Sequence, residues 1–179
     1  MDAEKLAPKL VLWIQDRIKE AGASGAVFGL SGGIDSSVIA ALCIRAFPGN
    51  SLGLIMPCHS IDEDRQHAEL VAGAFKVPTR LAPLDDIYNS LFKILPDFKS
   101  DAPLKRLAQA NLKARLRMVT LYYAANQLNY LVIGSGNRSE LTVGYFTKHG
   151  DSGVDILPIG NLVKKQVKEL AACLGVPPG

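Results

Sequence analysis

Apolar residues recur along the chain with two different spacings. Near the N-terminus, Leu6, Leu10, Ile14 and Ile18 follow one another every four residues. This spacing places the four side chains on one face of a helix, which we expect to end near Gly22 because glycine often follows the last helical turn. Elsewhere the chain has short runs that are almost wholly apolar, and such runs are typical of strands that are buried on both faces.

The same two patterns alternate to the C-terminus. Four strands are expected, at 26–30, 52–56, 79–82 and 130–133. Further helices are expected at 38–47, 62–75, 103–127 and 164–174, and the polar segment 96–103 is expected to be a loop. Strands that alternate with helices indicate a mostly parallel sheet with helices on both faces. The pattern therefore predicts an α/β fold of three layers, α/β/α.

Composition limits the class of protein without naming its chemistry. With 179 residues, 48% of them hydrophobic and 21% charged, the chain has the size and content of one globular domain with a single core. The net charge of +3 is small, and no dense run of Lys and Arg suggests binding to nucleic acid. No apolar run has the length of a membrane span, and the N-terminus lacks a signal pattern, so we expect neither a membrane nor a secreted protein.

The three cysteines, Cys43, Cys58 and Cys173, are far apart in the sequence. They form no CxxC pair and no Cys/His cluster that would indicate zinc. An odd number of separated cysteines is typical of reduced thiols, so we expect the protein to be cytoplasmic.

The segment from Gly29 to Ser37, which reads Gly-Leu-Ser-Gly-Gly-Ile-Asp-Ser-Ser, carries the strongest chemical signal. Paired glycines directly after a strand let the backbone turn tightly and approach a ligand. The amides at the start of the following helix then form an anion site, supported by the helix dipole. A carboxylate at Asp35 would repel a bare phosphate, but it suits a site in which Mg²⁺ bridges phosphates.

An ordinary turn with a helix cap is the plainer interpretation of such a segment, and a lone Gly-Gly pair would favour it. The full Ser-Gly-Gly-x-Asp-Ser string after an apolar strand favours function. A Walker A loop is excluded because the Gly-Lys-Ser/Thr ending is missing. The string resembles the SGGxDS signature of the ATP pyrophosphatase (PP-loop) family, also described as adenine nucleotide alpha-hydrolase-like, whose members cleave ATP between the α and β phosphates.

Four further segments narrow the resemblance. They are 111–118 (Asn-Leu-Lys-Ala-Arg-Leu-Arg-Met), 132–140, 144–151 (Gly-Tyr-Phe-Thr-Lys-His-Gly-Asp) and 155–160. Together they resemble the ammonia-dependent NAD synthetases. The resemblance implies an ATP- and Mg²⁺-dependent ligase that amidates deamido-NAD with ammonia through an adenylate, giving NAD, AMP and pyrophosphate. It also implies a homodimer, and it needs no covalent enzyme nucleophile.

The resemblance assigns roles to particular residues. The two implied magnesium ligands are Asp35 and Glu140. The implied contacts with deamido-NAD are Arg115, Lys148 and Asp155. The implied ATP-binding residues are Gly29, Leu30, Ser31, Gly32, Gly33, Ile34, Asp35, Ser36, Ser135 and Lys164.

Each of these residues also has a plainer interpretation. Glu140 and Asp155 could be solvated loop acids, and Arg115 could be a surface residue of a long helix. Lys148 and Lys164 could point into solvent. His149 has no visible acid–base partner and is interpreted as a loop residue, and the polar, glycine-rich stretch 138–160 is expected to be mobile without ligand.

Two other functions stay open at this level. One is another PP-loop enzyme, such as a GMP synthetase-like or tRNA-thiolating protein. The other is an ATP-binding module without turnover, because the NAD synthetase family continues beyond the point where this sequence stops. We expect residues 1–179 to form one NAD synthetase-like ATP pyrophosphatase domain that lacks the family's C-terminal segment.

Overall fold

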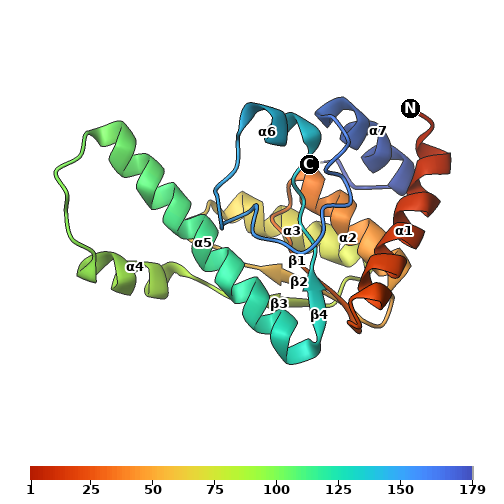
Figure 1. Ribbon diagram of the computed structural model, residues 1–179, viewed down its shortest axis with the longest axis horizontal. Helices are drawn as coiled ribbons and strands as arrows, with labels where there is room; N and C mark the ends of the chain where they lie inside the picture. Colours follow the sequence, from red (N-terminus) through yellow and green to blue (C-terminus); the bar gives the residue numbers. More distant parts are fainter. Residues whose placement is uncertain (179) are drawn as a thin grey trace.

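A four-stranded parallel sheet forms the centre of the protein, as the computed structural model of residues 1–178 shows (Figure 1). The strands are β1 (Gly25–Gly29), β2 (Ser51–Ile55), β3 (Thr79–Leu81) and β4 (Tyr130–Val132). Their order across the sheet is β3-β2-β1-β4, and all three neighbouring pairs are parallel. The strands predicted from the sequence are confirmed, each to within one residue at either end.

Seven helices lie within the described residues. They are α1 (Ala3–Glu20), α2 (Ile34–Ala46), α3 (Asp62–Phe75), α4 (Asp85–Ile94), α5 (Ala102–Leu128), α6 (Arg138–Val143) and α7 (Lys164–Leu174). The first helix carries the four-residue repeat and ends just before Gly22, as expected. Asp101 caps the long helix α5 by accepting a hydrogen bond from the Leu104 amide at 2.9 Å, and Gly175 ends α7 in the left-handed conformation.

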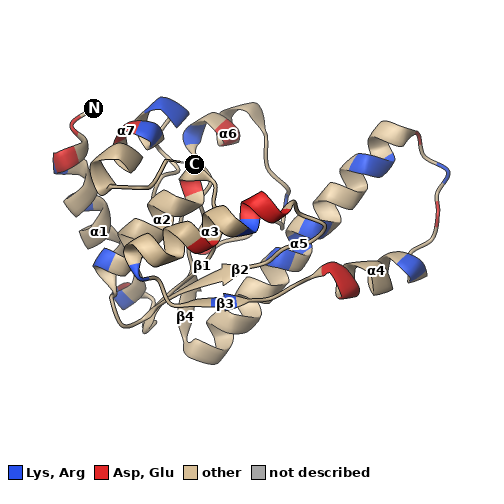
Figure 2. Cartoon of the chain, turned by 180° about the vertical axis from the view of Figure 1, so that it is seen from behind, with Lys and Arg blue, Asp and Glu red and all other residues tan. Residues whose placement is uncertain are grey.

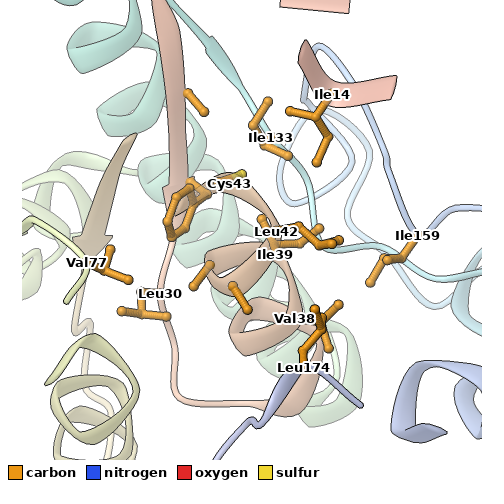
Figure 3. Close-up of a cluster of buried hydrophobic side chains, with 14 of the residues drawn as sticks. Ile14, Leu30, Val38, Ile39, Leu42, Cys43, Val77, Ile133, Ile159 and Leu174 are labelled. Carbon is orange, nitrogen blue, oxygen red and sulfur yellow. The ribbon is translucent and has the colours of Figure 1, made fainter. Parts of the chain in front are cut away.

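Helices cover both faces of the sheet, which confirms the predicted three-layer α/β/α fold. On one face, α2 lies between the sheet and the pair α1 and α7 (Figure 1). Figure 3 shows Val38, Ile39 and Leu42 of α2 in this cluster, together with Ile14 from α1 and Leu174 from α7. This helix is buried almost all round, which explains why its sequence shows a continuous apolar run instead of one apolar stripe.

The other face is covered by α5 and by the start of α4. Val27 and Val132 from the sheet meet Ala125 of α5 and Tyr88 of α4 in a second, smaller core. Beyond this core, the end of α4, the connection 95–101 and the N-terminal half of α5 project from the body as an arm (Figure 1). Among the described residues, no helix is both long and apolar enough to cross a membrane.

The sequence analysis missed two helices. No element was predicted between 82 and 96, where α4 forms, although the sequence carries the signal: two aspartates fill the first turn, and Ile87, Tyr88, Leu91 and Phe92 recur at helical spacing. The stretch 138–160 was expected to be mobile without ligand and no helix was predicted in it, but its first six residues form α6. This helix is held by a capping box, in which Asn137 and Glu140 bond each other's backbone amides, and that Asn-x-x-Glu spacing is a signal that could have predicted it.

Candidate active site

The glycine bend between β1 and α2 lies at the carboxyl ends of the strands, where ligands bind in open parallel sheets. Gly32 has a φ of +81°, which a side chain adopts only with strain. A Cβ on Gly32 would also come within 2.6 Å of the His67 Cβ and 2.8 Å of the Ala68 amide nitrogen in α3. Glycine is therefore required here both by the bend and by the close approach of α3.

Hydroxyl groups hold the bend in shape. The Ser36 and Ser37 hydroxyls donate to the Gly33 carbonyl oxygen at 2.8 and 2.9 Å, and both serines are buried. The Ser31 and Ser36 hydroxyl oxygens are 3.1 Å apart. Gly33 caps α2 without a side-chain hydrogen bond, so no side chain covers the first amides of this helix. The bend thus presents amides and the positive end of a 13-residue helix.

A cavity of about 450 Å³ opens beside the bend. Six of the predicted ATP-binding residues line it: Gly29, Leu30, Ser31, Gly33, Ser36 and Ser135. Its opposite wall is apolar and comes from the end of β2 and from Met118 and Leu121 of α5. An apolar slot that ends in a bend rich in amides and hydroxyls suits a flat base joined to a chain of phosphates.

Asp35, Asn137 and Lys164 meet in the first turns of three helices. The Asp35 carboxylate forms an ion pair with the Lys164 ammonium and accepts a hydrogen bond from the Asn137 side-chain amide at 3.1 Å. Glu140 bonds the Asn137 backbone amide at 3.2 Å, so the two predicted magnesium ligands contact one and the same residue. Among the described residues, the structure forms no cluster of three or more acidic, His or Cys side chains suited to a metal.

Arg115 and Lys148, two of the predicted deamido-NAD contacts, lie together. The Arg115 guanidinium donates two hydrogen bonds of 3.3 Å to the Lys148 carbonyl oxygen. The Thr147 hydroxyl donates to the Asn111 side-chain oxygen at 2.9 Å, so the segment 144–151 is fastened to α5 at two points. Arg115 and Lys148 are both exposed, and neither lines the cavity.

Asp155, the third predicted deamido-NAD contact, lies apart from those two. Its carboxylate accepts a hydrogen bond from the Tyr122 hydroxyl at 2.9 Å and one from the Val132 amide at 2.7 Å, beside a second hollow along β4. Burial, and then the bond to Asp155, raise the pKa of Tyr122 to about 12, so its hydroxyl is a neutral donor at ordinary pH.

Sequence reasoning missed two residues of this site. Arg117 lines the cavity, and its guanidinium donates to the Met56 carbonyl oxygen at 3.0 Å, which joins α5 to the end of β2. Asn137 is fully buried beside Asp35. The spacing from Asn137 to Glu140 could have shown its capping role. Nothing in the sequence indicated that Arg117 turns inward while Arg115, on the same helix, stays exposed.

The cavity wall also has a charged side. Asp64 and Arg65 of α3 and Arg117 of α5 all line it. Figure 2 shows the acidic first turn of α3 close to the basic turns in the middle of α5. Cys58 comes directly after Pro57, which lines the cavity, but Cys58 itself is buried. Burial raises the pKa of its thiol, which disfavours a thiolate nucleophile.

Comparison with known proteins shows which family the sequence resembles. The family model described as NAD synthase matches residues 6–179. The "NH(3)-dependent NAD(+) synthetase" of Carboxydothermus hydrogenoformans is 51% identical over 174 residues, which are 97% of this chain and 71% of that protein. The protein of the same description from Methanocaldococcus jannaschii is 45% identical over 178 residues, 97% of this chain and 67% of that protein.

Solved structures agree in fold. The NH3-dependent NAD synthetase of Campylobacter jejuni, solved with a nitrate ion, is 33% identical with a TM-score of 0.90, over 98% of this chain and 75% of that one. The NMN synthetase of Francisella tularensis is 35% identical with a TM-score of 0.90, over 99% of this chain and 72% of that one. The predicted resemblance is therefore confirmed: the chain belongs to the NAD synthase family.

Proposed function

We propose that this chain is an NH3-dependent NAD synthetase, a ligase that amidates deamido-NAD at the expense of ATP. The observation that carries the proposal is the uncapped start of α2 beside the cavity, with Asp35 and Lys164 next to it, in a chain of this family. The carboxylate of deamido-NAD would attack the α-phosphorus of ATP and release pyrophosphate. Ammonia would then displace AMP from the acyl adenylate, giving the amide of NAD.

ATP would lie in the cavity with its phosphates on the glycine bend. The residues from Gly29 to Ser36, together with Ser135, supply the amides and hydroxyls of that wall. The dipole of α2 favours the negative charge that grows on the departing pyrophosphate. The hydroxyls of Ser31 and Ser36 are 3.1 Å apart, and the structure describes no histidine bonded to either, so both act as donors and not as nucleophiles.

A magnesium ion fits the acidic residues beside the bend. Asp35 and Glu140 would hold it, because a hard cation prefers carboxylate oxygens and takes its remaining ligands from phosphates and water. Both carboxylates already contact Asn137, which keeps them in one place. When bound, the ion would neutralise charge on the phosphates.

Lys164 is proposed as a ligand of the ATP phosphates. In the structure its ammonium pairs with Asp35, and its side chain is 42% exposed, so the group has room to turn. Its backbone amide is fixed to the Ser139 hydroxyl at 3.0 Å, which holds the start of α7 beside α6. A phosphate oxygen would replace the Asp35 carboxylate as the partner of the ammonium.

Deamido-NAD would be bound by Arg115, Lys148 and Asp155. Arg115 and Lys148 stand together on the exposed side of α5 and can meet an anionic dinucleotide. Asp155 is held by two internal hydrogen bonds and still has free acceptor capacity, because each carboxylate oxygen has a second lone pair.

We also propose a homodimer formed through the arm. Its apolar side chains are strongly exposed: Ile94 is 78% and Phe98 is 81% accessible, and Leu104 and Leu107 are both more than half exposed. Apolar surface of this extent on one projecting element is typical of a protein–protein interface. A second copy is the occupant that the family resemblance implies.

The cytoplasm is the proposed location. The three cysteines are all free, and Cys43 and Cys58 are buried. Free thiols of this kind are typical of a reducing compartment.

A coupled assay tests the proposed reaction. The protein is supplied with ATP, Mg²⁺, ammonia and deamido-NAD, and NAD and AMP are measured together. Equal amounts of NAD and AMP support the proposal. Pyrophosphate release only with another acceptor, such as the deamidated mononucleotide or a tRNA, would move the chain to a different substrate. ATP binding without any turnover would contradict the synthetase activity.

A further inference from the structure

Asn137 is the fully buried polar side chain of the candidate site. It has no accessible surface, although it lies between Gly136 and the first residue of α6. A primary amide that is removed from water must find hydrogen-bond partners within the protein, because leaving it unsatisfied costs the full desolvation penalty. Its partners therefore show what the residue does.

Both ends of the Asn137 side chain are bonded, and each serves one of the two acidic residues. The side-chain nitrogen donates to Asp35 Oδ1 at 3.1 Å, across 102 positions of sequence. The side-chain oxygen accepts from the Glu140 amide at 3.1 Å. In return, Glu140 Oε2 accepts from the Asn137 backbone amide at 3.2 Å.

Capping of α6 accounts for only half of this arrangement. A cap needs an acceptor oxygen, and Ser, Thr and Asp provide one as well as Asn does. The side-chain nitrogen contributes nothing to the cap, and it is directed at a carboxylate on another helix. A neutral donor also suits a cation site, since it orients a carboxylate without competing for the ion as a positive charge would.

We infer that Asn137 is a positioning residue for the divalent cation, one that holds Asp35 and Glu140 at a constant separation. The inference rests on the proposed function, in which these two carboxylates share a magnesium ion. Hydrogen bonds to liganding carboxylates fix their orientation, and losing such a partner commonly lowers metal affinity by about 10–100-fold. Asn137 acts on the ion only through Asp35 and Glu140.

The variant Asn137→Ser separates the two roles of the side chain. Serine keeps the cap on α6 but is too short to reach Asp35 and lacks the second donor. The control is Thr142→Ala, which removes the bond of 2.7 Å from the Thr142 hydroxyl to the Arg138 carbonyl oxygen and so loosens α6 without touching either carboxylate or Lys164. Binding of Mn²⁺ to the full chain with a non-hydrolysable ATP analogue is followed by electron paramagnetic resonance, and nucleotide affinity is measured separately in EDTA.

We expect Asn137→Ser to bind Mn²⁺ about 10–100-fold more weakly, with nucleotide affinity in EDTA within about twofold of wild type. Thr142→Ala should bind Mn²⁺ as wild type does. Equal Mn²⁺ affinity in Asn137→Ser and wild type would overturn the inference. So would an equal loss in both variants, or a parallel loss of metal-free nucleotide binding, since either would mean general loosening. If the wild-type chain itself binds no Mn²⁺ with the nucleotide, the proposed magnesium site fails instead.

Discussion

The glycine bend and the arm differ in which side chains they bury: polar side chains are buried at the bend, and apolar side chains are exposed on the arm. At the bend, Ser36, Ser37 and Asn137 are buried, and their polar groups are bonded within the chain. On the arm, Ile94 and Phe98 are apolar and exposed. A buried polar group needs hydrogen-bond partners within its own chain, whereas an exposed apolar surface can be buried by a second molecule. The polar groups of the bend are therefore already bonded within the chain, whereas the arm keeps the exposed apolar surface that the proposed dimer would bury.

The largest expected effect comes from the acidic residue at the bend. Asp35→Ala should lower the rate of NAD formation by at least about 10²-fold, because the phosphates would lose the charge compensation that speeds their departure. The rate is measured with the coupled assay at saturating ATP and Mg²⁺.

The control for that variant is Asp16→Ala, which removes an exposed carboxylate on α1, far from the bend. It should leave the rate unchanged. A near-normal rate in Asp35→Ala, with an intact fold by circular dichroism, would contradict the metal role of Asp35.

The next effect concerns the rigidity of the bend. Gly32→Ala should destabilise the protein by about 1–2 kcal/mol through backbone strain and by about 1–3 kcal/mol more through the clash with α3. The matched control is Gly22→Ala. Gly22 also has a positive φ, of +67°, but a Cβ there meets no atom within 4 Å, so only the strain should remain. Urea unfolding measures both, and equal losses would show that α3 moves aside.

Negative charge placed on the arm tests whether its exposed apolar surface forms the proposed dimer interface. Ile94→Asp combined with Phe98→Asp should convert a dimer into a monomer, since burying two unpaired carboxylates in an apolar interface is costly. Size-exclusion chromatography with light scattering measures the mass. Leu12→Asp is the control, because Leu12 is 58% exposed on α1, away from the arm. A double variant that stays dimeric, or a wild-type chain that is monomeric, would exclude the arm as the interface.

A smaller effect is expected along α5, where two adjacent tyrosines face different ways. Tyr122→Phe removes the hydroxyl that donates to Asp155. Losing one hydrogen bond of roughly 1 kcal/mol should raise the KM for deamido-NAD about fivefold and leave the KM for ATP unchanged. Tyr123 is exposed and bonds only Gln127 among the described residues, so Tyr123→Phe should leave both values unchanged. Identical behaviour of the two variants would remove Asp155 from the deamido-NAD site.

The last prediction is a pH dependence of stability. The pKa of Tyr122 is raised to about 12 from 10.0 by burial and by Asp155. The unfolded phenol therefore ionises first, and the unfolded state binds fewer protons in this range. Stability from this group is fully present below pH 10 and is lost as the pH rises toward 12. Between these values the wild type should lose more stability than Tyr122→Phe in urea unfolding, and parallel losses would contradict the shift.

Local patterns predicted the sheet and five of the helices because burial and period are encoded over short distances. The missed helices show the limit. The helix α4 was overlooked although its apolar residues recur at helical spacing, and only one residue of this helix is buried. The short helix α6 was hidden within a glycine-rich stretch, although its capping box was present in the sequence. Among the predicted site residues, the six that line the cavity lie at or shortly after the carboxyl ends of β1 and β4, which are the strands that the sequence pattern predicted.

The chemistry of the bend could be read from local residues alone: paired glycines, serines and Asp35 after an apolar strand favour a tight turn and a helix start. Which distant groups meet at the bend depends on the packing of the whole fold. Asn137 and Lys164 stand 102 and 129 positions from Asp35, and a parallel sheet brings them together because the carboxyl ends of its strands share one edge. Contacts over such separations depend on how layers pack, and no local spacing encodes them.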